Sequence, residues 1–505
     1  MALIIAQYSM DFMFNFKNIY SKIISIDEIQ RQAIVSIIWK VALTFVGFFS
    51  TVYFARTVGA NTLGAYFLFV TYFSLINLVT DGGIGGAAIK RISEGKDQNE
   101  YFSAFLTIRA LLLILIISAL FLFQNYFNDL KSAGLFTWLL IALIASLIYG
   151  AFTVGVAGCG KMGIHATSGF IKEISRIIFQ VLAIFIGYGA AGLAGGFVLG
   201  LLAAAIMESR FFKLNFVPFK YSHIKNISTF SFWLFLSSGG TMIYSHADTV
   251  MIGYYLNNTD IGIYKIVMQV TSFAALTTIA IRSTLWPKVS YWGKNQKKEL
   301  IQKSLSKAFT YSLILAIPMF VGGSLLGDKL LYFLYGEEYS SGYFVLIVLL
   351  IVQIANVFQF LFTTYMGALD LQKSAFKATA IGASANIIIN IMLIPLIGIL
   401  GAAFATFITI SLNAFLAKRV ISNLIEVKIE YTSVLNILKA STIMGLFVGG
   451  YRLFVPLSNI WLTLIPIFLG GIIYSFLILK FDKEICNSLK KISIQMNIPW
   501  PDILG

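Results

Sequence analysis

The stretch "LGAYFLFVTYFSLINLVTDGGIGGAAIKR", residues 63–91, decides the fold class of this chain. Its first eighteen residues carry no charge, and most of their side chains are apolar. A helix that crosses a bilayer needs about 20 mostly apolar residues. We therefore predict a membrane-spanning helix at 63–89, which ends at the basic pair Lys90 and Arg91.

The glycine-rich end of this stretch has two interpretations. Residues 83–88 fit the loose GxGxxG/A pattern of a dinucleotide-binding loop. That loop needs a strand before it and a helix after it, whereas a predicted span and a polar connection flank it here. Small residues four apart, such as Gly82 and Gly86 or Gly83 and Ala87, let membrane helices approach closely. We therefore expect close helix packing at these glycines.

The rest of the chain repeats this pattern. It has 505 residues, of which 58% are hydrophobic and only 12% are charged, and a soluble protein of this length needs more polar surface. Run lengths and polar breaks predict an all-α polytopic membrane protein with about fourteen transmembrane helices. The predicted spans are 33–55, 63–89, 102–126, 135–158, 168–188, 192–212, 229–254, 261–287, 305–327, 342–368, 376–397, 399–417, 435–455 and 459–479.

The distribution of basic residues predicts the orientation. The chain carries a formal charge of +15, and its odd-numbered connections contain only Arg56, Lys131, Lys329 and Arg452 as basic residues. The even-numbered connections and the termini hold most of the others. Basic residues concentrate in cytoplasmic loops, so we predict a multi-pass protein of the cell (plasma or inner) membrane with both termini in the cytoplasm. This explains the charge without a nucleic-acid partner.

The spans group as six, six and two. We predict a cytoplasmic N-terminal lead-in at 1–32 and two pseudo-symmetric six-helix lobes. Two C-terminal helices and a basic cytoplasmic tail follow; this tail is either a helix on the inner leaflet or an ordinary solvated segment. The boundaries are 33–212 for the N-lobe, 213–228 for the cytoplasmic linker, 229–418 for the C-lobe, 435–479 for the last two helices and 480–505 for the tail.

Weak internal repeats support the two lobes. "LGAY" (63–66) recurs as "IGIY" (261–264) at an offset of 198 residues, which also relates Lys90 to Lys288. "GLAGG" (192–196) aligns with "GAAFA" (401–405) at an offset of 209 residues. Six helices repeated in one orientation imply an axis along the membrane normal, and transporters built this way bind substrate between the repeats.

Cations inside the predicted spans are the candidate substrate ligands. They are Lys40, Arg109, Arg176 and Arg282, each near the predicted cytoplasmic side. Intramembrane charges are costly and usually face a water-filled cavity or a partner. They therefore either line a cationic central cavity or, as we favour for Arg176, snorkel to the interface or form structural pairs.

Acidic and titratable residues inside spans are the gating or coupling candidates: Asp81, Asp248, Lys265 and His246. Asp81 lies nine residues before Lys90, roughly 13 Å from the inner boundary. It either neutralises Lys40 or Arg109, or acts as a switchable partner that releases a cation to the substrate. The hairpin near Asn257 places Asp248 and Lys265 at equal depth, so we predict that these two form a pair, either structural or gating.

The sequence lacks the motifs of an enzyme. No His, Cys, Asp and Glu cluster has metal-ligand spacing, and no nucleophile–base arrangement or Walker motif is present. The two cysteines, Cys159 and Cys486, fall in segments predicted to be cytoplasmic, where no disulfide is expected. We therefore predict a transporter without a cofactor, driven by an H⁺ or Na⁺ gradient or by the free energy of the substrate itself.

The chain resembles the polysaccharide transporter family, the O-antigen flippase type, of the multidrug/oligosaccharidyl-lipid/polysaccharide exporter superfamily. Matching text includes "VGANTLGAYFLFVTYFSLINLVTDGGIGGAAIKRIS", "DTVMIGYYLNNTDIGIY" and "YMGALDLQKSAFKATAIGASANIIINIMLIPLIGILGAAFAT". The resemblance implies alternating access and transfer of a polyprenyl-linked oligosaccharide to the outer leaflet, with a cationic cavity for its pyrophosphate that Arg109 and Arg282 would suit. It also implies membrane lipids and polysaccharide-assembly membrane proteins as candidate partners.

Three alternatives remain. An ion-coupled multidrug or metabolite antiporter would have a site dominated by acids, whereas the deep charges here are mainly basic. A flippase for the peptidoglycan lipid precursor has the same fold and is poorly separated by sequence. A polytopic glycosyltransferase or ligase usually needs large outer loops, whereas the longest predicted outer connection here is short, at 328–341.

Overall fold

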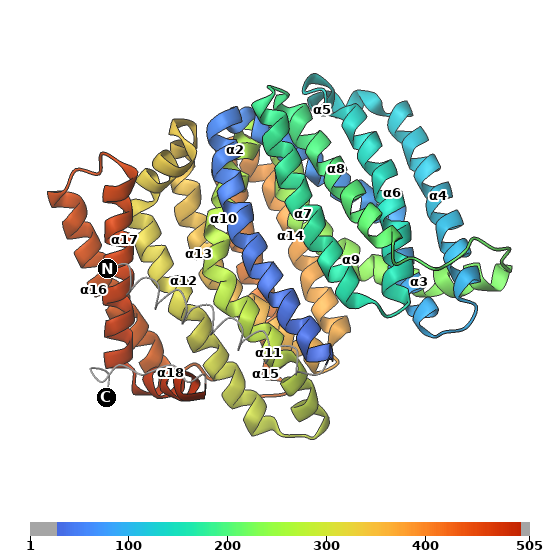
Figure 1. The fold of residues 1–505 in the computed structure, drawn as a ribbon. Coiled ribbons are helices and arrows are strands. Elements are labelled where there is room, and N and C mark those ends of the chain that lie inside the picture. Colours follow the sequence, from blue (N-terminus) through green and yellow to red (C-terminus); the bar gives the residue numbers. More distant parts are fainter. Residues whose placement is uncertain (1–27, 496–505) are drawn as a thin grey trace, which may run out of the picture. The chain divides into compact units, whose positions relative to one another are not determined.

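The structure is a computed structural model that describes residues 28–495, and all regular elements in that range are helices (Figure 1). Its first half contains α2 (Glu28–Asp81), α3 (Ile84–Ser93), α4 (Gln98–Leu122), α5 (Asn128–Ser132), α6 (Phe136–Gly158), α7 (Met162–Phe185), α8 (Gly189–Ser209) and α9 (Tyr221–Tyr255). Its second half contains α10 (Asn258–Ser272), α11 (Leu276–Lys294), α12 (Lys298–Tyr335), α13 (Tyr343–Ala368), α14 (Gln372–Ile397), α15 (Ile399–Ser422), α16 (Tyr431–Phe454), α17 (Ile460–Phe481) and α18 (Lys483–Gln495). Short 3₁₀ turns lie at η1 (Gln124–Phe127), η2 (Phe273–Ala275) and η3 (Glu337–Gly342).

The predicted spans all fall on helices. Eleven helical stretches of the described range are long and apolar enough to cross a membrane. One of them, Leu43–Asp81, contains most of two predicted spans, because α2 changes direction at Gly59, whose φ is 75°. The less apolar α7 and α9 coincide with two further predicted spans. The chain is therefore an all-helical, multi-pass membrane protein, as predicted.

The glycine-rich stretch is not one continuous helix, contrary to our prediction for 63–89. Gly82 and Gly83 adopt left-handed φ values of 53° and 75°, which end α2 and restart the helix as α3. Glycine takes this conformation without a steric penalty. The predicted close packing is confirmed: a Cβ on Gly83 would lie 2.5 Å from the carbonyl oxygen of Ser231 in α9.

The described chain separates into two compact units. The first comprises residues up to 50, 76–126 and 137–235, and the second comprises 51–75, 127–136 and the residues from 236 on. These units cut across the lobes predicted from sequence, since 51–75 groups with the C-terminal half. The lobe boundaries themselves stay a prediction.

The first unit is built around small residues and one apolar cluster. The backbone of α8 approaches α7 closely, because a Cβ on Gly196 would lie 2.5 Å from the Cγ atom of Gln180. Ile92 of α3 and Phe105 of α4 are fully buried, and both belong to one apolar cluster with Leu214 of the 210–220 connection. Close helix approach and apolar burial are the packing terms that hold membrane helices together.

The second unit has its core between α12, α13, α16 and α17. The tail helix α18 joins this core, since Ile485 and Cys486 are buried and the hydroxyl of Tyr311 donates to Ser488 over 2.9 Å. An ion pair of 2.5 Å joins Lys307 to Glu484. The tail up to residue 495 is therefore a helix docked on the unit, rather than an ordinary solvated segment.

Candidate functional site

Arg109 of α4 is a buried cation with partners already in place. Its side chain lies 3.5 Å from the Asp81 carboxylate, and its Nη2 donates to Asn77 Oδ1 and to the Ser146 carbonyl, each over 3.3 Å. Only 6% of Arg109 is exposed. Gly150 makes room for the guanidinium, because a Cβ there would overlap it. Of the partners considered for Asp81, the structure pairs it with Arg109.

The other cations predicted in the N-terminal half differ in what surrounds them. Arg176 forms a 2.8 Å ion pair with Glu173, which also binds Lys172 over 3.1 Å. This agrees with the favoured structural interpretation of Arg176. Lys40 lies in α2, but its side chain is outside the described residues.

Arg282 of α11 is the opposite case. Its side chain is exposed, and its guanidinium carbon lies 4.9 Å from the Phe360 ring centre and 5.9 Å from that of Trp286. Within residues 28–495, no described carboxylate forms an ion pair with it. Aromatic faces hold a guanidinium without neutralising it. Among the described residues, Arg282 is therefore a candidate ligand for an anion, because its ring contacts leave it without an ion-pair partner.

Asp248 of α9 is held by neutral donors. The hydroxyls of Tyr264 and Thr406 donate to its Oδ2 over 2.8 Å and 2.7 Å, and the Asn390 amide donates to its Oδ1 over 2.8 Å. Only 8% of Asp248 is exposed. The direct hydrogen-bond partners of this carboxylate are therefore all neutral, and the buried Lys265 interacts with it electrostatically from beyond ion-pair distance.

The predicted pair between Asp248 and Lys265 is not among the ion pairs of the described residues. The carboxylate instead meets Tyr264, the residue before Lys265. His246 is half-buried, and its Nδ1 atom lacks a hydrogen-bond partner in the described range. Sequence reasoning missed Asn390 and Thr406, although "NIIIN" (386–390), two amides one helical turn apart in an apolar run, is a usable signal.

A close crossing joins residues 51–75 to the start of α10 and to η3, within the second unit. A Cβ on Gly64 would overlap the carbonyl of Asn258, and a Cβ on Gly262 would overlap the carbonyl of Ala60. The 198-residue offset of the repeat relates Ala60 to Asn258 and Gly64 to Gly262. The crossing is therefore pseudo-symmetric, with each glycine facing the carbonyl of the other repeat.

Two side chains reinforce this crossing at helix ends. The Ala60 amide, just after the bend at Gly59, donates to the Glu338 carboxylate over 2.9 Å. Arg56 donates in turn to the carbonyls of Phe333 and Leu334, at the C-terminal end of α12. A carboxylate at one helix start and a guanidinium at one helix end satisfy backbone groups that a helix leaves unpaired.

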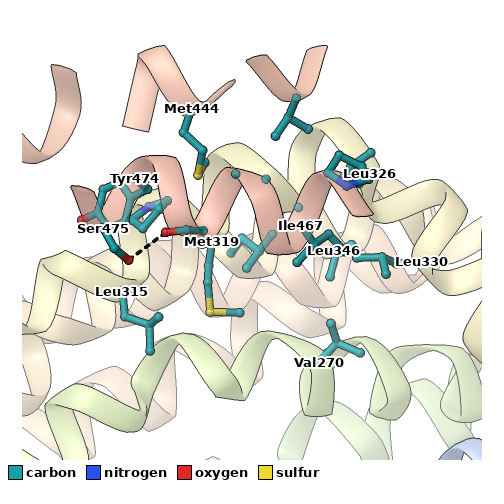
Figure 2. Close-up of a pocket in the computed structure, with 18 of the residues that line it drawn as sticks. Val270, Leu315, Met319, Leu326, Leu330, Leu346, Met444, Ile467, Tyr474 and Ser475 are labelled. Carbon is teal, nitrogen blue, oxygen red and sulfur yellow. Dashed lines mark hydrogen bonds between the residues drawn. The ribbon is translucent and has the colours of Figure 1, made fainter. Parts of the chain in front are cut away.

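An apolar cavity of about 460 Å³ lies in the second unit, among α12, α13, α16 and α17, with Val270 of α10 (Figure 2). Met319, Leu346, Met444 and Ile467 are among the side chains that line it. The hydroxyl of Ser475 on the cavity wall is already satisfied, since it donates to the carbonyl of Gly471 over 2.7 Å (Figure 2). The cavity suits a flexible hydrocarbon rather than a polar molecule.

These features define a class: a helical, multi-pass membrane protein with an unneutralised cation, a buried acid and an apolar cavity in one unit. Residues 53–343 match the model of a family described as polysaccharide biosynthesis proteins, and the chain belongs to that family. The resemblance seen in the sequence is thereby confirmed.

Named relatives match this chain over most of its length and of theirs. The chain is 26% identical over 435 residues to the probable low-salt glycan biosynthesis flippase Agl15 of Haloferax volcanii, covering 86% of this chain and 92% of the relative. It is 25% identical to the probable flippase AglR of the same organism, covering 76% and 82%. The lipid II flippase MurJ, in an inward closed conformation, superposes with a TM-score of 0.74 at 19% identity, covering 90% of this chain and all of MurJ. That likeness shows a shared fold.

Proposed function

We propose that this protein is a flippase that moves a polyprenyl-(pyro)phosphate-linked oligosaccharide from the cytoplasmic to the outer leaflet, for cell-surface polysaccharide or glycan biosynthesis. The observation that carries the proposal is Arg282, a cation inside a membrane span that no described carboxylate neutralises. A guanidinium suits phosphate geometry, and a phosphate-linked lipid is an anion that must pass this depth. The relatives named as glycan biosynthesis flippases support the same function.

The apolar cavity supports the lipid part of the substrate. A glycan cannot cross the hydrocarbon core unaided, because each desolvated hydroxyl costs free energy. The isoprenoid chain has no such cost, so it needs only apolar surface close to the head group. The cavity beside Met319 and Leu346 offers that surface within the same unit as Arg282.

The glycine crossing supports alternating access. With both termini in the cytoplasm, as the charge distribution predicts, Gly64 and Gly262 lie toward the outer surface. We propose that their crossing closes the outer exit while the site faces the cytoplasm, and that it opens to release the substrate. The charged groups of the crossing, Arg56 and Glu338, lie at helix ends near the predicted outer surface, where water can replace their partners when the crossing opens.

The buried Asp248 supports ion coupling. The three direct donors to its carboxylate are neutral, and Lys265 lies beyond ion-pair distance, which leaves the carboxylate open to a proton or Na⁺. We propose that exchange of this ion drives the cycle, since a gradient supplies the free energy that the chain does not take from a nucleotide.

Translocation in proteoliposomes tests the function. The probe is a fluorescent polyprenyl-diphosphate disaccharide, and its transfer is followed by lectin accessibility. We expect Arg282→Ala to lose at least about tenfold in rate, equivalent to about 1.4 kcal/mol. Lys294→Ala, which removes a charge from the exposed end of the same helix, is the matched control and should flip normally. Normal flipping by Arg282→Ala would remove the support for the proposal.

The antiporter alternative is favoured by one observation, the buried acid Asp248. It predicts gradient-driven export of cationic drugs and no transfer of the disaccharide probe. A flippase for the peptidoglycan lipid precursor predicts that this precursor competes with the disaccharide probe and is transferred faster. The same vesicles therefore separate all three functions.

A further inference from the structure

One face of α13 changes character along its length. Toward its N-terminal end this face carries Val345, Leu349 and Val352, all of which are buried. From residue 353 on, the same face carries Gln353 and Asn356, which are half-exposed. The exposure and the polarity of this face therefore both increase from residue 353 on.

The amides of this face have unused hydrogen-bonding capacity. The Asn356 amide donates to Gln353 Oε1 over 3.3 Å, which leaves the amide nitrogen of Gln353 free of any described partner. Gln359, three residues or nearly one turn after Asn356, makes no side-chain hydrogen bond with another described residue. An unpartnered amide in hydrocarbon costs several kcal/mol, so polar side chains inside spans face water-filled cavities or other polar groups.

This polar face leads to Arg282. Phe360 lies one turn beyond Asn356, and the guanidinium carbon of Arg282 lies 4.9 Å from the centre of its ring. Gln353 lies seven residues before Phe360, so the amides extend roughly 10 Å along the helix from the level of the cation. That length matches about two sugar rings linked to a phosphate held at Arg282.

We propose that Gln353, Asn356 and Gln359, the α13 amide face, bind the sugars nearest the phosphate of a lipid-linked oligosaccharide. The proposal rests on the proposed flippase function and adds the surface that selects the glycan. Amides both donate and accept hydrogen bonds, as sugar hydroxyls do, and they add no charge that would favour a drug cation. Arg282 binds the phosphate of any such lipid, whereas the amide face distinguishes its sugars.

The test compares two probes on purified full-length protein. One is a polyprenyl-diphosphate disaccharide, and the other is the same polyprenyl diphosphate without sugar. The variant Gln353→Met/Asn356→Leu/Gln359→Met keeps side-chain volume and removes the hydrogen bonds. We expect its Kd for the disaccharide probe to rise at least about tenfold, while its Kd for the sugar-free probe stays at the wild-type value. Arg282→Ala should weaken both.

The controls distinguish a failure of this proposal from a failure of the proposed flippase function on which it rests. Gln302→Met on α12 removes an amide from outside this face and should bind both probes normally, and unchanged melting temperatures show that the variants fold. If the triple variant binds the disaccharide as tightly as wild type, or loses both probes equally, the amide face does not select sugars. If the wild-type protein binds neither probe, the proposed function itself fails.

Discussion

Arg109 and Arg282 look alike in the sequence, because each is a lone arginine in an apolar helix. In the structure, however, their partners differ. Arg109, in the first unit, is buried against Asp81, Asn77 and Ser146. Arg282, in the second unit, rests on two aromatic rings and meets no described carboxylate. The first is balanced where it lies, and the second is available to a ligand. The comparison teaches that position in a span does not distinguish the two arginines, whereas the carboxylate that each one meets or lacks does.

The largest expected effect is on the stability of the protein when the Asp81–Arg109 ion pair is broken. Asp81→Asn leaves Arg109 buried without its counter-charge, which we expect to cost about 3 kcal/mol of stability. Thermal unfolding in detergent checks this. The double variant Asp81→Asn/Arg109→Gln should recover most of the loss, and Arg282→Ala should melt like wild type. If Arg282→Ala is as destabilised as Asp81→Asn, the contrast between the two arginines is wrong.

The next effect concerns the glycine crossing of the second unit. Gly64→Ala places a methyl group against the Asn258 carbonyl, and such overpacking typically costs about 1–3 kcal/mol in the closed arrangement. We expect slower flipping and greater labelling of a cysteine at Ala60 by a membrane-impermeant maleimide added outside. Gly450→Ala, where a Cβ meets open space, is the control. Unchanged labelling in Gly64→Ala would show that the crossing does not form the seal.

The two buried acids extend the comparison. Asp81 forms an ion pair with Arg109, whereas the direct partners of Asp248 are neutral and Lys265 lies beyond ion-pair distance, so we expect ion exchange at Asp248. Asp248→Asn preserves shape and should lower gradient-driven flipping by about fivefold, or about 1 kcal/mol, while transfer without a gradient is unchanged. Vesicles with imposed proton or sodium gradients supply the measurement. A variant that still responds to both gradients would place the coupling ion elsewhere.

The smallest effect tests how the free arginine is held. Phe360→Leu keeps an apolar side chain but removes the ring beneath Arg282, and such contacts are worth about 0.5–1 kcal/mol. We expect binding of the sugar-free polyprenyl diphosphate to weaken by about threefold. Phe358→Leu, two residues from Phe360 and on another side of α13, should have no such effect on binding. Equal Kd values for the two variants would mean that the ring does not position the guanidinium.

Much of the fold could be predicted because hydropathy is a local property. All fourteen predicted spans fall on helices, and the close packing expected at Gly83 was found. The break in the helix at Gly82 was not predicted, because glycine pairs are also common inside continuous membrane helices. The left-handed turn depends on the approach of α9, which lies about 150 residues further along the chain.

Less of the candidate site could be predicted. Arg109 was among the partners named for Asp81, and the structure pairs the two, whereas Asp248 and Lys265 form no ion pair among the described residues. The hairpin argument predicted equal depth for the two side chains, and that depth stays a prediction. It did not reveal that Asn390 and Thr406, which lie 142 and 158 residues away in the sequence, donate hydrogen bonds to the Asp248 carboxylate. The depth of a side chain can be predicted by counting residues along its helix. Which other side chains it faces depends on the positions of the other helices.

The sequence by itself determined that this chain is a multi-pass helical membrane protein, which side of each span is basic, and which charges lie within the spans. The run lengths and charges that decide these properties are local, and a bilayer acts on each segment separately. Only the tertiary structure decided which charge is balanced and which stays available. That choice depends on whether a carboxylate from a distant helix comes within a few ångströms, and close packing between helices sets that distance.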